Sequence, residues 1–262
     1  MEEDTKLTYL ERQVAAFLAA LRFLTIIPVP WKAERDGEHF TSSLIYFPII
    51  GILIGFSGWL LVVISQFFFP QPVVVVFVVS YLAFISGCLH LDGLSDSGDG
   101  LLSSRPRERA LEIMKDSRVG AMGVIVTIFV LLGKYSALSS MDGHLLGPAV
   151  FFMPIAGRVA ILLFMAALPY ARHEGGLGLL FYTSSVKKTA LFGMAVLTAL
   201  LAVFALSHCF VVLFFVVVLF FFFRRWCRAK LGGATGDTLG AGCELTEMVV
   251  AMAFSVTFSL PI

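Results

Sequence analysis

Blocks of about twenty apolar residues, separated by short polar stretches, constrain this chain more than any other feature of its sequence. One block reads FPIIGILIGFSGWLLVVIS, over residues 47–65, and similar blocks recur along most of the 262 residues. A helix of about 20 apolar residues crosses the roughly 30 Å hydrocarbon layer of a bilayer. A soluble domain of this size would need far more than 14% charged residues to cover its surface. The sequence therefore predicts an all-α polytopic membrane helix bundle, a single integral membrane domain over residues 1–262.

Hydropathy predicts about seven transmembrane helices in this bundle. Residues 8–30 precede them and include VAAFLAALRFLTIIPVP, in which Arg22 interrupts the apolar run and Pro28 and Pro30 end it. This segment is predicted to form an interfacial or re-entrant helix rather than a short eighth span. The predicted spans lie near residues 43–68, 73–90, 120–140, 147–168, 189–206, 209–223 and 246–261.

Lysine and arginine residues predict which side of the membrane each connection faces. All but two of the 19 fall in four stretches: the N-terminal region to Arg35, then 105–118, 172–188 and 224–230. The alternate connections, FFFPQP, MDGH and SHC, contain none. Because cytoplasmic loops carry the excess of Lys and Arg, the N-terminus and the basic loops are predicted to be cytoplasmic. No basic patch with interleaved aromatics is long enough to indicate nucleic-acid binding, and the sequence leaves open whether the chain forms a homo-oligomer.

The two remaining cations, Lys134 and Arg158, fall inside predicted spans. Lys134 is expected near the outer end of its helix, where a lysine side chain can reach the interface. Arg158 is deeper, and intramembrane charges usually face a partner or a cavity, so a structural pairing and a functional role are both open. Gly51, Gly55 and Gly58 recur at helical spacing and predict close packing against another helix.

The stretch GCLHLDGLSDSGDG, residues 87–100, places three aspartates directly after an apolar run. At 100° per residue, Asp92, Asp96 and Asp99 fall within about 60° of one helix face. Carboxylates this close repel each other unless a cation binds them, and oxygen ligands without His or Cys favour Mg²⁺, which commonly bridges to phosphate. The pattern therefore predicts a magnesium site at these aspartates. The glycines among them are expected to let a bulky ligand approach the backbone.

The basic stretch SSRPRERALEIMKDSRVGAMGV follows at once. Metal ligands on one side and guanidinium groups on the other suit a phosphorylated substrate. The KDSRVG motif in this stretch contributes Lys115, Asp116 and Arg118.

A second acidic stripe lies in GGATGDTLGAGCELTE, where Asp237, Glu244 and Glu247 recur at helical spacing. Thr235 and Asp237 are also expected to begin the helix as caps. Two acidic stripes at cytoplasmic boundaries can converge on one site, and together they favour metal-assisted phosphoryl or phosphodiester transfer. An ion-coupled transporter is the main rival, but its acidic residues are expected near mid-membrane in paired halves.

Four segments of the sequence together resemble the bacterial cobalamin synthase family, the adenosylcobinamide-GDP ribazoletransferases. They are FLTIIPVP, LHLDGLSDSGDGL, LEIMKDSRVGAMG and GGATGDTLGAGCELTE, in family order and spacing between about Phe17 and Glu247. The resemblance implies a bacterial inner-membrane enzyme that joins adenosylcobinamide-GDP to α-ribazole or its 5′-phosphate, with Mg²⁺ and release of GMP. A CDP-alcohol phosphotransferase is the nearest alternative, but its D-G-x-x-A-R signature fails after Asp92-Gly93.

The resemblance also implies roles for individual residues. Asp92, Asp96 and Asp99 would hold the metal on the diphosphate. Further ligands or the general base would come from Asp116, Asp237, Glu244 and Glu247. The leaving phosphate would be steadied by Lys115, Arg118 and Arg158. The small residues 232–242 are expected to floor a groove through which the large corrinoid approaches.

Overall fold

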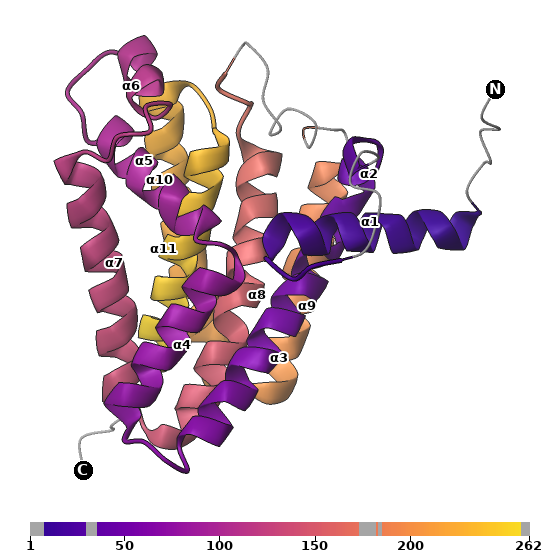
Figure 1. Cartoon of the computed structure of the whole chain (residues 1–262), viewed down its shortest axis with the longest axis vertical. Coiled ribbons are helices and arrows are strands. Elements are labelled where there is room, and N and C mark those ends of the chain that lie inside the picture. The colour runs from indigo at the N-terminus through magenta and orange to yellow at the C-terminus, as the bar shows by residue number, and fades with distance from the viewer. Residues whose placement is uncertain (1–7, 30–35, 173–181, 183–184, 258–262) are drawn as a thin grey trace.

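A computed structural model describes residues 8–29, 36–172, 182 and 185–257, and these form helices with no β-strand (Figure 1). The predicted all-α bundle is therefore confirmed for this part of the chain. The helices are α1 (Tyr9–Leu24), α2 (Asp36–Ser43), the 3₁₀ turn η2 (Leu44–Tyr46), α3 (Phe47–Ser65), α4 (Gln71–Ile85), α5 (Leu89–Leu101), α6 (Arg107–Ile113), α7 (Ala121–Ser140), α8 (Gly143–Ala167), α9 (Val186–Phe204), α10 (Leu206–Leu231) and α11 (Gly236–Phe254).

Each of the seven predicted spans overlaps a helix, but the count of seven is not confirmed. Within the described ranges, five segments are long and apolar enough to cross a membrane, and the bent pair of α4 and α5 would make a sixth. Helix α11 is not among them because it carries three carboxylates in 19 residues. The end of the predicted span 246–261 and most of the basic stretch 172–188 lie outside the described residues.

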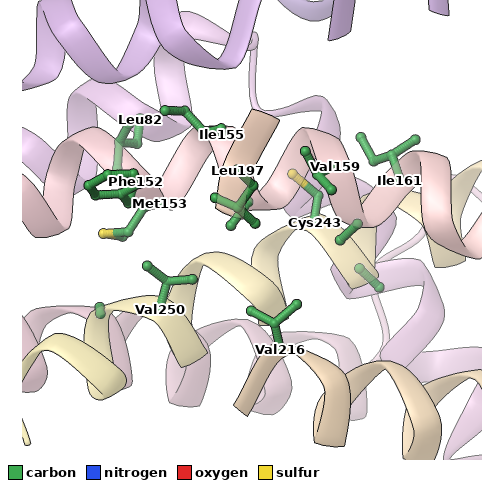
Figure 2. Packing of buried hydrophobic residues seen from close by; sticks show 14 of the residues in the cluster. Leu82, Phe152, Met153, Ile155, Val159, Ile161, Leu197, Val216, Cys243 and Val250 are labelled. Atoms are coloured by element: carbon green, nitrogen blue, oxygen red, sulfur yellow. The ribbon is translucent and has the colours of Figure 1, made fainter. Parts of the chain in front are cut away.

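Helix α8 is the centre of the bundle. In the most apolar 18-residue stretch of α8, 83% of the residues are buried inside the protein, whereas the corresponding share in α10 is 22%. Figure 2 shows Phe152 and Val159 of α8 packed among residues of the surrounding helices, including Val250 of α11. On the α3 side, a methyl group added at Gly51 would lie 2.8 Å from the Cα of Ile155, so only glycine allows this approach. The expected close packing of the α3 glycines is confirmed.

Helix α1 lies crosswise to α3 and α9 rather than along the bundle (Figure 1). Its inner face consists of fully buried alanines, Ala15, Ala16, Ala19 and Ala20, whereas Tyr9 and Leu10 are largely exposed. With 16 residues it is not one of the helices long enough to cross a membrane. The interfacial or re-entrant placement of residues 8–30 stays a prediction.

The chain turns sharply between α4 and α5, whose axes differ in direction by 86°. Gly87 and Cys88 both adopt left-handed backbone conformations, with φ of 59° and 58°. The amide of Ile26 donates a hydrogen bond to the carbonyl of Ile85 at 2.8 Å, which ties the segment after α1 to this break. The predicted span 73–90 therefore ends early, and α5 runs in a new direction, unbroken through its glycines to Leu101.

Candidate functional site

Helices α5 and α11 cross with their backbones in contact. A methyl group added at Gly93 would lie 2.8 Å from the backbone oxygen of Asp237, and one added at Gly240 would lie 3.2 Å from the Cα of His90. This crossing brings the start of α11 beside the acidic face of α5. The expectation that the glycines of α5 leave room for a ligand is wrong at Gly93, because α11 occupies that surface.

Three carboxylates meet at this crossing, and we call Asp92, Asp96 and Asp237 the carboxylate face. Asp92 is exposed, while Asp96 and Asp237 are half-buried. Asp96 is close enough to Asp92 and Asp237 for their negative charges to repel the charge of its own carboxylate. The sequence predicted that two acidic stripes would converge, and the structure brings one end of each together here.

Arg172 is the cation of this site, and the sequence reasoning did not single it out. Its Nη2 donates to Oδ2 of Asp237 at 2.6 Å, and the hydroxyl of Thr235 donates to the same oxygen at 3.3 Å. The Nε of Arg172 is buried and has no hydrogen-bond partner among the described residues. The amide of Ala171 donates to the carbonyl of Ala234 at 2.8 Å, which fixes this segment beside α11. In the sequence, Arg172 was indistinguishable from the general excess of positive charge in cytoplasmic loops.

Asp99 shares the α5 face but is engaged elsewhere. Its two carboxylate oxygens accept hydrogen bonds from the backbone amides of Gly120 at 2.7 Å and Gly123 at 2.9 Å. These amides lie at the start of α7 and have no partner within that helix. Asp99 therefore closes the N-terminal end of α7 from a neighbouring helix.

The remaining carboxylates of α5 fit a magnesium ion that is shared with a substrate. Within the described ranges, no three His, Cys, Asp or Glu side chains gather closely enough to enclose a metal ion. Asp92 and Asp96 lie one turn apart on the same face of α5. Mg²⁺ is usually held by one or two carboxylates, with water and substrate phosphates completing its shell. The donor set fits that arrangement and does not fit a metal enclosed by protein alone.

Glu244 and Glu247 lie deep in the bundle, in what we call the buried ion cluster with Lys134 and Arg158. The Nζ of Lys134 lies 2.7 Å from Glu244 and 2.6 Å from Glu247, and Nη1 of Arg158 lies 2.5 Å from Glu247. Each of the four residues is at most 3% exposed. The expectation that Lys134 reaches the membrane interface is wrong, because two carboxylates of α11 hold its ammonium group inside. Arg158 has the acidic partner that its depth required.

Lys115, Asp116 and Arg118 lie in the turn before α7. Nη2 of Arg118 donates to Oδ2 of Asp116 at 2.6 Å, and these hydrogen bonds lower the pKa of Asp116 to about 2. The side chain of Arg118 is 88% exposed, and Lys115 is exposed as well. Asp116 is therefore a weak proton acceptor, whereas both cations are open to a ligand from solvent.

Residues 232–242 do not form the floor of a groove as expected. Gly233, Gly240 and Gly242 are buried against other segments of the protein. Gly232 and Gly236 are exposed, and a methyl group added at Gly236 would meet no atom within 4 Å. Open space at this crossing is therefore found beside the first turn of α11.

The profile of the cobalamin-5-phosphate synthase family matches residues 16–255 of the chain. Three curated relatives, each named adenosylcobinamide-GDP ribazoletransferase, match over nearly the whole length. The protein of Acetivibrio thermocellus is 36% identical over 94% of this chain and 98% of its own, and that of Citrobacter koseri is 39% identical over 90% and 98%. The protein of Clostridium acetobutylicum is 33% identical over 88% and 92%. No solved structure matches the chain significantly.

Proposed function

The chain belongs to the cobalamin-5-phosphate synthase family, and on that basis we propose that it joins adenosylcobinamide-GDP to α-ribazole or α-ribazole 5′-phosphate and releases GMP. The product is adenosylcobalamin or its 5′-phosphate. We propose that the enzyme works in a bacterial inner membrane with the carboxylate face on the cytoplasmic side. The bacterial relatives, the membrane-length helices and the distribution of Lys and Arg support this location.

The observation that carries the proposal is the convergence of Asp92 and Asp96 on α5 with Asp237 at the start of α11 and Arg172 in the segment after α8. A diphosphate carries negative charge that must be neutralised before a nucleophile can attack phosphorus. The carboxylate face supplies donors for Mg²⁺, and Arg172 supplies guanidinium N–H groups beside it. Both kinds of group are thus present within one crossing of two helices.

In the proposed reaction, a ribose hydroxyl of the ribazole attacks the phosphorus next to the aminopropanol arm of the corrinoid. The new P–O bond forms as the bond to the GMP oxygen breaks, so that GMP leaves with its electron pair. Mg²⁺, held by Asp92 and Asp96, would neutralise the diphosphate when bound. Asp237 accepts the proton of the attacking hydroxyl. Arg172, which holds Asp237 through Nη2, directs its other terminal N–H groups to the phosphate oxygens.

Asp237 is the preferred base among the four carboxylates considered for that role. Glu244 and Glu247 are at most 3% exposed inside the bundle, and Arg118 lowers the pKa of Asp116 to about 2. Asp237 is also paired with a cation, Arg172, but it lies on the carboxylate face. Asp237 is the member of this group whose charge reaches Asp96. Its position at the open first turn of α11 also leaves space for a substrate beside Gly236.

The test is release of GMP by the purified protein in liposomes, supplied with adenosylcobinamide-GDP, α-ribazole 5′-phosphate and either Mg²⁺ or excess chelator. Release that requires both substrates and the metal is expected. Asp92→Asn and Asp96→Asn should each abolish turnover while the thermal unfolding midpoint in detergent stays unchanged. Asp142→Asn, in the connection between α7 and α8, is the matched control and should keep turnover.

Two outcomes would contradict the proposal. GMP release that survives the chelator would remove the metal from the mechanism and leave the transfer reaction standing. No release from protein shown to be folded would overturn the reaction itself, and CDP-alcohol substrates would then be tested in the same liposomes.

A further inference from the structure

Helix α10 is longer than a bilayer requires. Its 26 residues span about 39 Å, against a hydrocarbon layer of roughly 30 Å. Its C-terminal turns therefore extend beyond the hydrocarbon into the headgroup region. This end of the helix carries Arg224, Arg225, Arg228 and Lys230.

One outward face of α10 changes from apolar to cationic along its length. Phe210, Phe214, Val217 and Phe221 recur at helical spacing and are each more than half exposed. The next two turns of the same face carry Arg224, Arg225 and Arg228. We call these seven residues the α10 stripe.

A cavity of about 350 Å³ opens on the cationic part of the stripe. The described residues that line it are Phe221, Arg224, Arg225, Arg228 and Ala229. The Nε of Arg224 donates a hydrogen bond to the carbonyl of Ala167 at 3.4 Å, which leaves its terminal nitrogens available. Within the described ranges, none of these arginines has a carboxylate partner within 4 Å.

The other cations near this end of α10 are used within the fold. Lys230 donates to the carbonyls of Ser103 and Arg105, and Arg107 donates to the carbonyls of Leu231 and Ala171. These bonds tie α10 to the segment around α6. The three arginines of the stripe instead line the cavity.

We propose that the α10 stripe binds an anionic phospholipid, with its phosphate among the three arginines and an acyl chain along the apolar turns. Arginine forks match phosphate oxygens, and basic hollows on the cytoplasmic side of membrane proteins suit anionic headgroups. Trp226 is partly exposed at the same level, as expected of an aromatic side chain at the interface. A soluble phosphate would use the arginines but would gain nothing from the apolar residues that continue the stripe.

A tryptophan placed at position 221, which lines the cavity, provides a direct test in the full-length protein. In nanodiscs, the fluorescence of a Trp31→Phe/Trp59→Phe/Trp226→Phe/Phe221→Trp variant reports on that position alone, because the chain has three tryptophans. Brominated phosphatidylglycerol and brominated phosphatidylcholine are compared as quenchers. Phosphatidylglycerol is expected to quench at a mole fraction on the order of tenfold lower, because the arginines favour an anionic headgroup over a zwitterionic one.

Two pairs of substitutions separate the cavity from general surface charge. Arg225→Gln/Arg228→Gln should remove the preference for phosphatidylglycerol. Lys187→Gln/Lys188→Gln removes the same number of charges from exposed positions at the start of α9 and should leave the preference intact. Equal quenching by both lipids in the parent protein, or equal loss from both pairs, would overturn the proposal.

A soluble ligand is distinguished by titrating inorganic phosphate and diphosphate in detergent without lipid. A saturable change in the fluorescence of the Phe221→Trp variant, together with no preference between the two lipids, would assign the cavity to a soluble phosphate and overturn the lipid site. Should the arginine variant fail to fold, mass spectrometry of the lipids retained by the unmodified protein replaces it. Retention of phosphatidylcholine equal to that of phosphatidylglycerol, from an equal mixture, would also refute the proposal.

Discussion

Replacing Lys134 with methionine is expected to lower the free energy of unfolding by about 3–5 kcal/mol, the usual cost of removing one partner from a buried ion pair. The Nζ of Lys134 donates to Glu244 at 2.7 Å and to Glu247 at 2.6 Å, and all three side chains are at most 4% exposed. Methionine fills most of the same volume, so the loss comes from uncompensated charge rather than from a cavity. Arg158 still pairs with Glu247 in this variant, which leaves Glu244 as the unpaired carboxylate.

Thermal unfolding of the purified protein in detergent measures this loss, and the midpoint should fall by about 6–20 °C. Lys134→Met/Glu244→Gln removes one charge of each sign and should recover most of the difference. Lys188→Met, at an exposed position of α9, is the matched control and should shift the midpoint by no more than about 2 °C. If Lys134→Met behaved like the control, or if the double variant recovered nothing, the buried ion cluster would not stabilise the bundle as argued.

Three further predictions concern the candidate site. Gly93→Ala places a methyl group against the α11 backbone and should lower both the unfolding midpoint and GMP release, whereas Gly236→Ala enters open space and should preserve the midpoint. Asp99→Asn replaces one of the two carboxylate oxygens that accept from the α7 amides and should cost about 1–2 kcal/mol of stability. Asp92→Asn should abolish turnover without that cost. Loss of stability in Asp92→Asn and loss of turnover alone in Asp99→Asn would exchange the two roles. Arg172→Gln should raise the KM for adenosylcobinamide-GDP at least tenfold, and an unchanged KM with normal folding would exclude Arg172 from substrate binding.

The length of the apolar blocks predicted most helices but not the path of the chain between them. The predicted spans 120–140 and 147–168 lie close to α7 and α8. The run 73–90 is equally apolar, yet the helix stops at Ile85 because Gly87 and Cys88 take left-handed conformations. Hydropathy reports the composition of a segment and contains no information on its direction. A left-handed cysteine is also a conformation that local propensities do not favour.

Helical spacing predicted which acidic side chains share a face but not what each one bonds. Asp92, Asp96 and Asp99 lie on one uninterrupted helix, as predicted. The partners of Asp99 are amides at Gly120 and Gly123, more than twenty residues further along the chain. Such partners depend on how α5 packs against α7, and periodicity within α5 cannot supply that information.

The acidic stripe on α11 shows more clearly that periodicity does not predict bonding partners, since its residues lie in two different environments. Asp237 and Glu247 are ten residues apart, which corresponds to about 15 Å along a helix. Asp237 lies at the open end beside Arg172, whereas Glu244 and Glu247 lie where Lys134 meets α11. One stripe thus passes from the candidate site into the core.

Charge balance separates these two environments physically. The buried ion cluster contains two carboxylates and two cations, so with all four ionised its net charge is zero, as its burial requires. The carboxylate face contains three carboxylates, and Arg172 pairs with one of them, which leaves a net charge of −2 at full ionisation. That excess is the charge of one divalent cation, and it lies where the side chains are open to solvent and substrate. The number of cations that neighbouring helices supply therefore distinguishes carboxylates that hold the bundle together from those able to bind a metal.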